Sequence, residues 1–82
     1  MILLKDKVDL INLFRDAIHY KRPVALFITI PGCPKPELIV NQPENLEYKL
    51  EYYLENYDPK ILEHKKAKGV RIVGYTVLDE KW

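Results

Sequence analysis

The sequence contains no serine and a single cysteine, Cys33, so several kinds of site lack their reactive group. A serine nucleophile is excluded, and one cysteine can form neither an internal disulfide nor the thiol pair of a thioredoxin-type site. Cys33 lies in a proline-rich run, residues 31–36, where an incidental loop cysteine is favoured over a redox role. The cysteine usage argues against a secreted disulfide scaffold and fits a reducing cytoplasm.

Glycine and histidine are scarce as well, with three and two residues respectively. There is no Gly-rich phosphate loop, and His19 and His64 fall on different predicted elements without zinc-ligand spacing. No apolar run approaches the roughly 20 residues that span a bilayer, and residues 1–4 are too few for a signal peptide. We therefore predict a chain that is not an enzyme, has no cofactor or metal, and does not enter a membrane.

The 82 residues are expected to form one domain, residues 1–82, with 48% hydrophobic and 30% charged residues. The net charge of +1 conceals a segregation along the chain. Residues 44–58 hold five carboxylates and one lysine (net −4), whereas residues 59–82 hold six Lys or Arg and three acids (net +3). Such neighbouring opposite charges are more typical of complementarity within a fold or a dimer than of a duplex-binding surface.

Apolar periodicity predicts a first helix over residues 6–20, capped by Asp6 or Asp9. Residues 24–30 are β-branched and aromatic with both faces mostly apolar, which indicates a central strand. With residues 37–40 they form a predicted hairpin whose tip is stiffened by prolines. Residues 60–64 alternate like a short strand, with a further helical turn as the alternative. After a turn at 65–69, residues 70–78 read as a strand in which Gly74 indicates a bulge or a close approach.

The run NQPENLEYKLEYYLENY, residues 41–57, predicts the helix that organises the rest of the chain. Asn41 is expected to cap it, with Pro43 in the first turn. At about 100° per residue, one face is apolar and another is acidic. The apolar face holds Leu46, Leu50, Tyr53, Leu54 and Tyr57, and the acidic ridge holds Glu44, Glu47, Glu51 and Glu55.

These elements predict an α+β fold with two helices on one face of a three- or four-stranded, mainly antiparallel sheet. The order is α-β-β-α-(β)-β. If residues 1–4 pair as a strand, the order becomes β-α-β-β-α-β, the ferredoxin-like arrangement.

The first candidate site is a protein interface on the organising helix, made by Tyr48 and Tyr52 beside Glu51 and Glu55. The two tyrosines lie away from the leucines, and tyrosine is enriched at protein interfaces. The alternative is that strands or the tail with Trp82 cover them. From this pair we predict a small cytoplasmic binding protein that binds a protein partner, with a homodimer expected because burial between subunits stabilises a small domain.

The second candidate is a basic hairpin that could bind an anion, and its cations fall within twelve residues. They are Lys60, His64, Lys65, Lys66, Lys68 and Arg71. The ligand would be a small phosphorylated molecule such as a nucleotide, or single-stranded nucleic acid, with Tyr75 or Trp82 as a stacking plane. The alternative is a solvated hairpin tip, because lysine-rich turns commonly serve solubility.

The runs PENLEYKLEYY (residues 43–53), YD (57–58) and IVGY (72–75) resemble small proteins carried by phages and prophages of Gram-positive bacteria. The likeness covers about residues 37–78. It implies a small accessory protein that acts in the host cytoplasm by binding another molecule. It carries over no catalytic residue.

Overall fold

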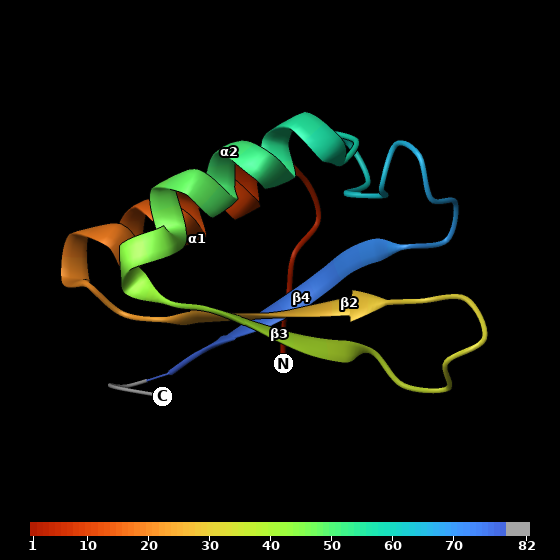
Figure 1. Cartoon of the computed structure of the whole chain (residues 1–82), viewed down its shortest axis with the longest axis horizontal. Helices are drawn as coiled ribbons and strands as arrows, with labels where there is room; N and C mark the ends of the chain where they lie inside the picture. Colours follow the sequence, from red (N-terminus) through yellow and green to blue (C-terminus); the bar gives the residue numbers. More distant parts are fainter. Residues whose placement is uncertain (79–82) are drawn as a thin grey trace.

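In the computed structural model, which describes residues 1–78, two helices pack on one face of a four-stranded sheet (Figure 1). The elements in chain order are β1 (Ile2–Leu3), α1 (Lys7–Tyr20), β2 (Val24–Thr29), β3 (Glu37–Asn41), the 3₁₀ helix η1 (Pro43–Asn45), α2 (Leu46–Asn56) and β4 (Arg71–Val77). The predicted α+β class, with both helices on one face of an antiparallel sheet, is confirmed.

The sheet order is β1-β4-β2-β3, and every neighbouring pair is antiparallel. It follows that β1 runs parallel to β2 with β4 between them, and that β3 runs parallel to β4 with β2 between them. The chain therefore consists of two interlocked β-α-β units, each split by a strand of the other. Residues 1–4 do contribute a strand, because Ile2 and Leu3 pair with Tyr75 and Gly74. The element order is β-α-β-β-α-β.

Helix α1 begins and ends where its sequence signals place it. The Asp6 side chain caps the helix by accepting a hydrogen bond of 3.2 Å from the Asp9 backbone N–H. Lys21 adopts the left-handed conformation (φ 54°), and Pro23 follows two residues later. The buried face of α1 packs on the sheet through Leu10, Leu13, Phe14 and Ala17.

The predicted cap of the second helix is wrong. Asn41 is the last residue of β3 and is only 2% exposed, with its Nδ2 donating to the Val24 carbonyl at 3.2 Å. Because that side chain is engaged in the sheet, the chain first makes the 3₁₀ turn η1. Helix α2 starts at Leu46, and its N-cap residue, Asn45, makes no side-chain capping bond.

Residues 60–64 form neither the predicted strand nor a further turn of helix. The Asp58 carboxylate accepts the backbone N–H groups of Lys60 and Ile61 at 2.8 and 3.2 Å, which curls the chain there. Leu62 then takes a left-handed conformation (φ 56°) and is buried. The segment contributes only isolated bridges, Tyr57 with His64 and Glu63 with Arg71.

Both interpretations of Gly74, a β-bulge and a close approach of another segment, are correct. The register of β2 on β4 shifts between Phe27 and Ile28, which pair with Gly74 and Ile72, so Val73 is the bulged residue. A Cβ on Gly74 would lie 2.6 Å from Met1 Sδ and 2.7 Å from the Ile2 carbonyl oxygen. Glycine is therefore needed at this position, where β1 pairs with β4.

Candidate functional site

Helix α2 presents a solvent-exposed surface that we call the acidic-tyrosine face, made of Glu47, Tyr48, Glu51, Tyr52 and Glu55. All five residues are exposed, Tyr48 by 71% and Tyr52 by 39%. The opposite side of α2 is buried on the sheet and on α1. Within residues 1–78 no strand covers the two tyrosines; Trp82, the other group expected to cover them, lies outside the described residues.

Tyr52 is oriented by the residues beneath it. Its ring meets Tyr53 edge to face, with ring centroids 5.4 Å apart, and Lys49 Nζ lies 5.1 Å from the Tyr52 centroid. Tyr53 in turn contacts Phe14 at 5.9 Å and Tyr57 at 5.7 Å. These ring contacts restrict the Tyr52 side chain while leaving it 39% exposed.

Burial changes the ionisation of two tyrosines in this chain. Desolvation by burial, the largest cause, raises the pKa of Tyr53 to about 12. Desolvation also raises the pKa of Tyr57, with a smaller contribution from the neighbouring Tyr52. Both hydroxyls are therefore uncharged near neutral pH and serve as packing and hydrogen-bonding groups.

The predicted anion-binding residues lie on a loop, residues 58–70, and at the start of β4. Its acidic side chains are occupied by the loop's own backbone: Asp58 accepts two N–H groups, and Glu63 Oε2 accepts the Gly69 N–H at 2.9 Å. We call the exposed cations Lys60, Lys65, Lys66, Lys68 and Arg71 the basic loop. The backbone that carries them, residues 58–71, lies at one end of the molecule beside the tip of the β2–β3 hairpin (Figure 1).

His64 lies in the same loop, and its ring makes two contacts of its own. Its ring lies 5.0 Å from Tyr57 in an edge-to-face contact, and its Nδ1 accepts the Lys66 backbone N–H at 3.0 Å. An Nδ1 that accepts cannot donate to an anion. Tyr75, expected as a stacking plane, instead lines a groove beside α1. Tyr75 therefore lies away from the lysines, whereas His64 stays in the loop beside Lys65 and Lys66.

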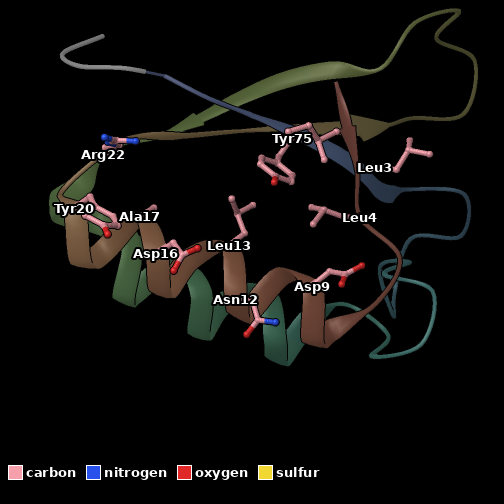
Figure 2. Close-up of a pocket in the computed structure, with 11 residues that line it drawn as sticks. Leu3, Leu4, Asp9, Asn12, Leu13, Asp16, Ala17, Tyr20, Arg22 and Tyr75 are labelled. Atoms are coloured by element: carbon pink, nitrogen blue, oxygen red, sulfur yellow. The ribbon is translucent and has the colours of Figure 1, made fainter.

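That groove lies between α1 and the β1–β4 edge of the sheet and encloses about 420 Å³ (Figure 2). Apolar groups from Leu4, Leu13 and Ala17 line it, and the carboxylates of Asp9 and Asp16 stand on its α1 side. Sequence reasoning missed this feature. The available signal was the polar stripe at Asp9, Asn12 and Asp16, spaced three and four residues apart beside the apolar arc of α1. Chemically the groove offers an apolar floor, two carboxylates and the guanidinium of Arg22.

The remaining candidates for chemistry are isolated from one another. Cys33 is exposed in the loop between β2 and β3, where its backbone N–H donates to the Ile30 carbonyl at 3.0 Å. Across residues 1–78, no three His, Cys, Asp or Glu side chains gather as a metal-binding group. None of the helices in this part of the chain is long and apolar enough to cross a membrane.

Comparison with known proteins adds no relative to this picture: the chain matches no protein-family model, no curated protein and no solved structure.

Proposed function

We propose that this chain is a non-enzymatic protein-binding module of the cytoplasm, in the manner of a small phage or prophage accessory protein, and that the acidic-tyrosine face binds its partner. The supporting observation is Tyr48, 71% exposed between acidic neighbours on a helix whose other side is buried. A tyrosine supplies a large, rigid contact area with a polar tip, which suits a protein interface.

The chemistry of this face favours a basic partner rich in arginine. Glu47, Glu51 and Glu55 place three carboxylates on a single side of α2. A guanidinium can pair with a carboxylate through two hydrogen bonds and can also stack on a tyrosine ring, whereas a lysine ammonium does neither as well. The partner therefore presents an arginine-rich segment long enough to span the exposed turns of α2.

A second copy of this chain fits the acidic-tyrosine face poorly. Two-fold symmetric pairing centred near Glu51 would place Glu47 of one copy close to Glu55 of the other. Facing carboxylates repel and would offset the contact made by the tyrosines. We therefore assign this face to a different protein.

The test uses a synthetic arginine-rich peptide, with lysine-rich and glutamate-rich peptides of equal length for comparison. We expect the arginine peptide to bind most tightly, the lysine peptide more weakly and the glutamate peptide not at all. NMR shifts on binding should map to residues 47–55. Replacing Tyr48 and Tyr52 together by Ala should weaken binding about tenfold, because exposed tyrosine anchors carry much of the energy of such contacts.

Tyr20→Ala is the matched control, because Tyr20 is 61% exposed and lies on α1. This variant should bind the arginine peptide as the unmodified protein does. The proposal fails if the Tyr48/Tyr52 double variant stays folded and binds equally well. It also fails if that variant unfolds, since the tyrosines would then belong to the core.

The basic loop supports a second candidate function, binding of a small phosphorylated ligand or of single-stranded nucleic acid. The observation in its favour is that Asp58 and Glu63 are held by backbone N–H groups of the loop itself. The five exposed cations are thus presented by a loop with a defined conformation. Lysine and arginine side chains hold phosphate by charge-assisted hydrogen bonds.

A further inference from the structure

The face of the sheet that points away from the helices has an unusual surface. Strand pairing places Leu3, Gly74, Phe27 and Leu38 in one row across all four strands. A second row holds Thr76, Ala25 and Val40. Both helices lie on the other side of the sheet, where the core is built from the alternate residues of the same strands, such as Leu26 and Ile39 (Figure 1).

These two rows, which we call the open sheet face, carry no charged side chain and one polar residue, Thr76; Gly74 and Ala25 within them are buried. Leu3 is 67% exposed and Leu38 is 44% exposed, while Phe27 and Val40 are half-buried. An antiparallel sheet with one solvated face ordinarily alternates apolar and polar residues, so that the solvated side is polar. Here the alternation is missing, and leucine and phenylalanine stand where polar residues are expected. Exposed leucines beside half-buried apolar residues on one solvated face are typical of an interaction site.

We propose that a second copy of this chain covers the open sheet face, so that two sheets pack face to face about a two-fold axis. An uncharged apolar face meets its own copy without like-charge repulsion, which neither the acidic-tyrosine face nor the basic loop could do. Sheets pack in this way about 10 Å apart through interdigitating side chains. Charged or strongly polar partners would gain nothing from these two rows.

The size of the face also suits a second copy. The backbone extends 33 × 24 × 18 Å, and the helix and sheet layers stack along the intermediate dimension (Figure 1). The whole sheet side of the molecule therefore has an outline of about 600 Å² (33 × 18 Å), of which the two rows occupy a part, so two copies would bury at most about 1,200 Å² in total, the lower end of specific protein–protein interfaces. A reversible, concentration-dependent dimer is the expected result.

Such a dimer would have both α2 helices on its two outer surfaces. Resting on the proposed function, this arrangement makes the assembly bivalent: a partner with two arginine-rich segments could engage both acidic-tyrosine faces. The second contact would then be intramolecular and would gain from a raised effective concentration.

Analytical ultracentrifugation over a concentration series reaching the millimolar range tests the dimer. Leu38→Lys should raise the dimer dissociation constant about tenfold or more. Each of the two copies would then place one charge in the buried apolar contact. Ile61→Lys is the matched control, since Ile61 is 45% exposed and lies in the loop after α2. That variant should leave the dissociation constant unchanged. Leu38→Thr, which keeps the β propensity of the strand, should weaken the dimer less than Leu38→Lys and still more than Ile61→Thr.

Three results would overturn the proposal: a monomer throughout the series, equal effects of Leu38→Lys and Ile61→Lys, or loss of the dimer in the Tyr48/Tyr52 double variant alone. A tandem arginine-rich peptide separates this inference from the proposed function. It should bind the unmodified protein more tightly than the Leu38→Lys variant, while the single peptide binds both equally. Absence of single-peptide binding would remove the proposed function and leave the dimer standing.

Discussion

The Tyr53 hydroxyl donates a hydrogen bond of 3.1 Å to Oδ1 of Asn41, and each of these residues is 2% exposed. Asn41 Nδ2 donates in turn to the carbonyls of Val24 and Ile39, at 3.2 and 3.4 Å. One buried amide thus joins α2 to the hairpin of β2 and β3. Within residues 1–78, no buried side-chain nitrogen or oxygen is left without a hydrogen-bond partner.

Breaking this connection should destabilise the protein. Asn41→Ala is expected to lower the free energy of unfolding by about 2 kcal/mol, because it leaves the buried Tyr53 hydroxyl and two carbonyls without their donor or acceptor. Tyr53→Phe should lower it by about 1 kcal/mol, since the Asn41 amide keeps its two carbonyl partners. Urea unfolding of both single variants and the double variant measures the coupling. Strictly additive effects would contradict a direct bond between the two side chains.

Alkaline pH should weaken the fold through the same tyrosine. Folding raises the pKa of Tyr53 from its ordinary value of 10.0 to about 12. Between these values the unfolded chain has lost the phenolic proton and the folded chain keeps it, so the free energy of unfolding falls as pH rises. The stabilisation is complete below pH 10 and is lost as pH rises through about 12.

Urea unfolding of the unmodified protein and of Tyr53→Phe, measured at intervals from about pH 8 upward, checks this prediction. The unmodified protein should lose its advantage in unfolding free energy over Tyr53→Phe above pH 10, the ordinary pKa of tyrosine. The reason is that phenylalanine does not ionise. Lysine titration affects both proteins alike and cancels in the difference. A constant difference across the whole range would show that Tyr53 ionises as easily in the folded state as in the unfolded chain.

Gly74→Ala should displace β1 from the sheet edge. The added methyl group would lie 2.7 Å from the Ile2 carbonyl oxygen, a contact with backbone that a side-chain rotation cannot relieve. The Leu4 N–H, which donates to the Val73 carbonyl at 3.1 Å, should then lose its protection from hydrogen exchange. NMR-detected exchange measures this amide directly.

Gly32→Ala is the control for that experiment. Gly32 has a φ of +85°, and a methyl group added there would meet no atom within 4 Å, so the change adds only backbone strain of about 1 kcal/mol. It should lower the thermal midpoint without exposing the Leu4 amide. If Leu4 remains protected in Gly74→Ala, then β1 tolerates the methyl group and the close approach does not require glycine.

The sequence predicts the helices and long strands well because their signals are local. Asp6 and the apolar spacing from Leu10 to Ala17 define α1, and the β-branched run that begins at Val24 defines β2. Asn41 misleads because an asparagine shortly before a proline is typical of a helix cap, whereas here tertiary contacts with Val24 and Tyr53 engage its side chain. Leu62 misleads because its burial follows from a left-handed turn, which an alternating pattern does not reveal.

The surfaces are predictable to different degrees. The exposure of Tyr48 follows from its angle on α2, so the acidic-tyrosine face can be drawn from periodicity alone. The separation of Tyr75 from the lysines depends on which side of β4 faces the core. The groove beside Asp9 and Asp16 depends on β1, a strand of two residues whose pairing the sequence leaves open. These features are set by long-range packing.

Replacing Lys65, Lys66 and Lys68 together by Gln tests the basic loop. At low salt we expect nucleotides or a short single-stranded oligonucleotide to raise the thermal midpoint of the unmodified protein. The triple variant should show no such rise, and its own midpoint without ligand should change little because the three side chains are exposed. The binding constant of the unmodified protein should fall with rising salt, with a slope that reflects the number of phosphate contacts.

The matched control replaces Lys5, Lys7 and Lys21 by Gln, which removes the same charge from exposed positions near the two ends of α1. A ligand held by the basic loop should still raise the midpoint of this control variant, because the five exposed cations of the loop remain in place. An equal loss of binding in both triple variants would mean that net charge alone attracts the ligand. If no phosphorylated ligand raises the midpoint at low salt, the loop is a solvated, lysine-rich turn that keeps this end of the sheet from pairing with other chains.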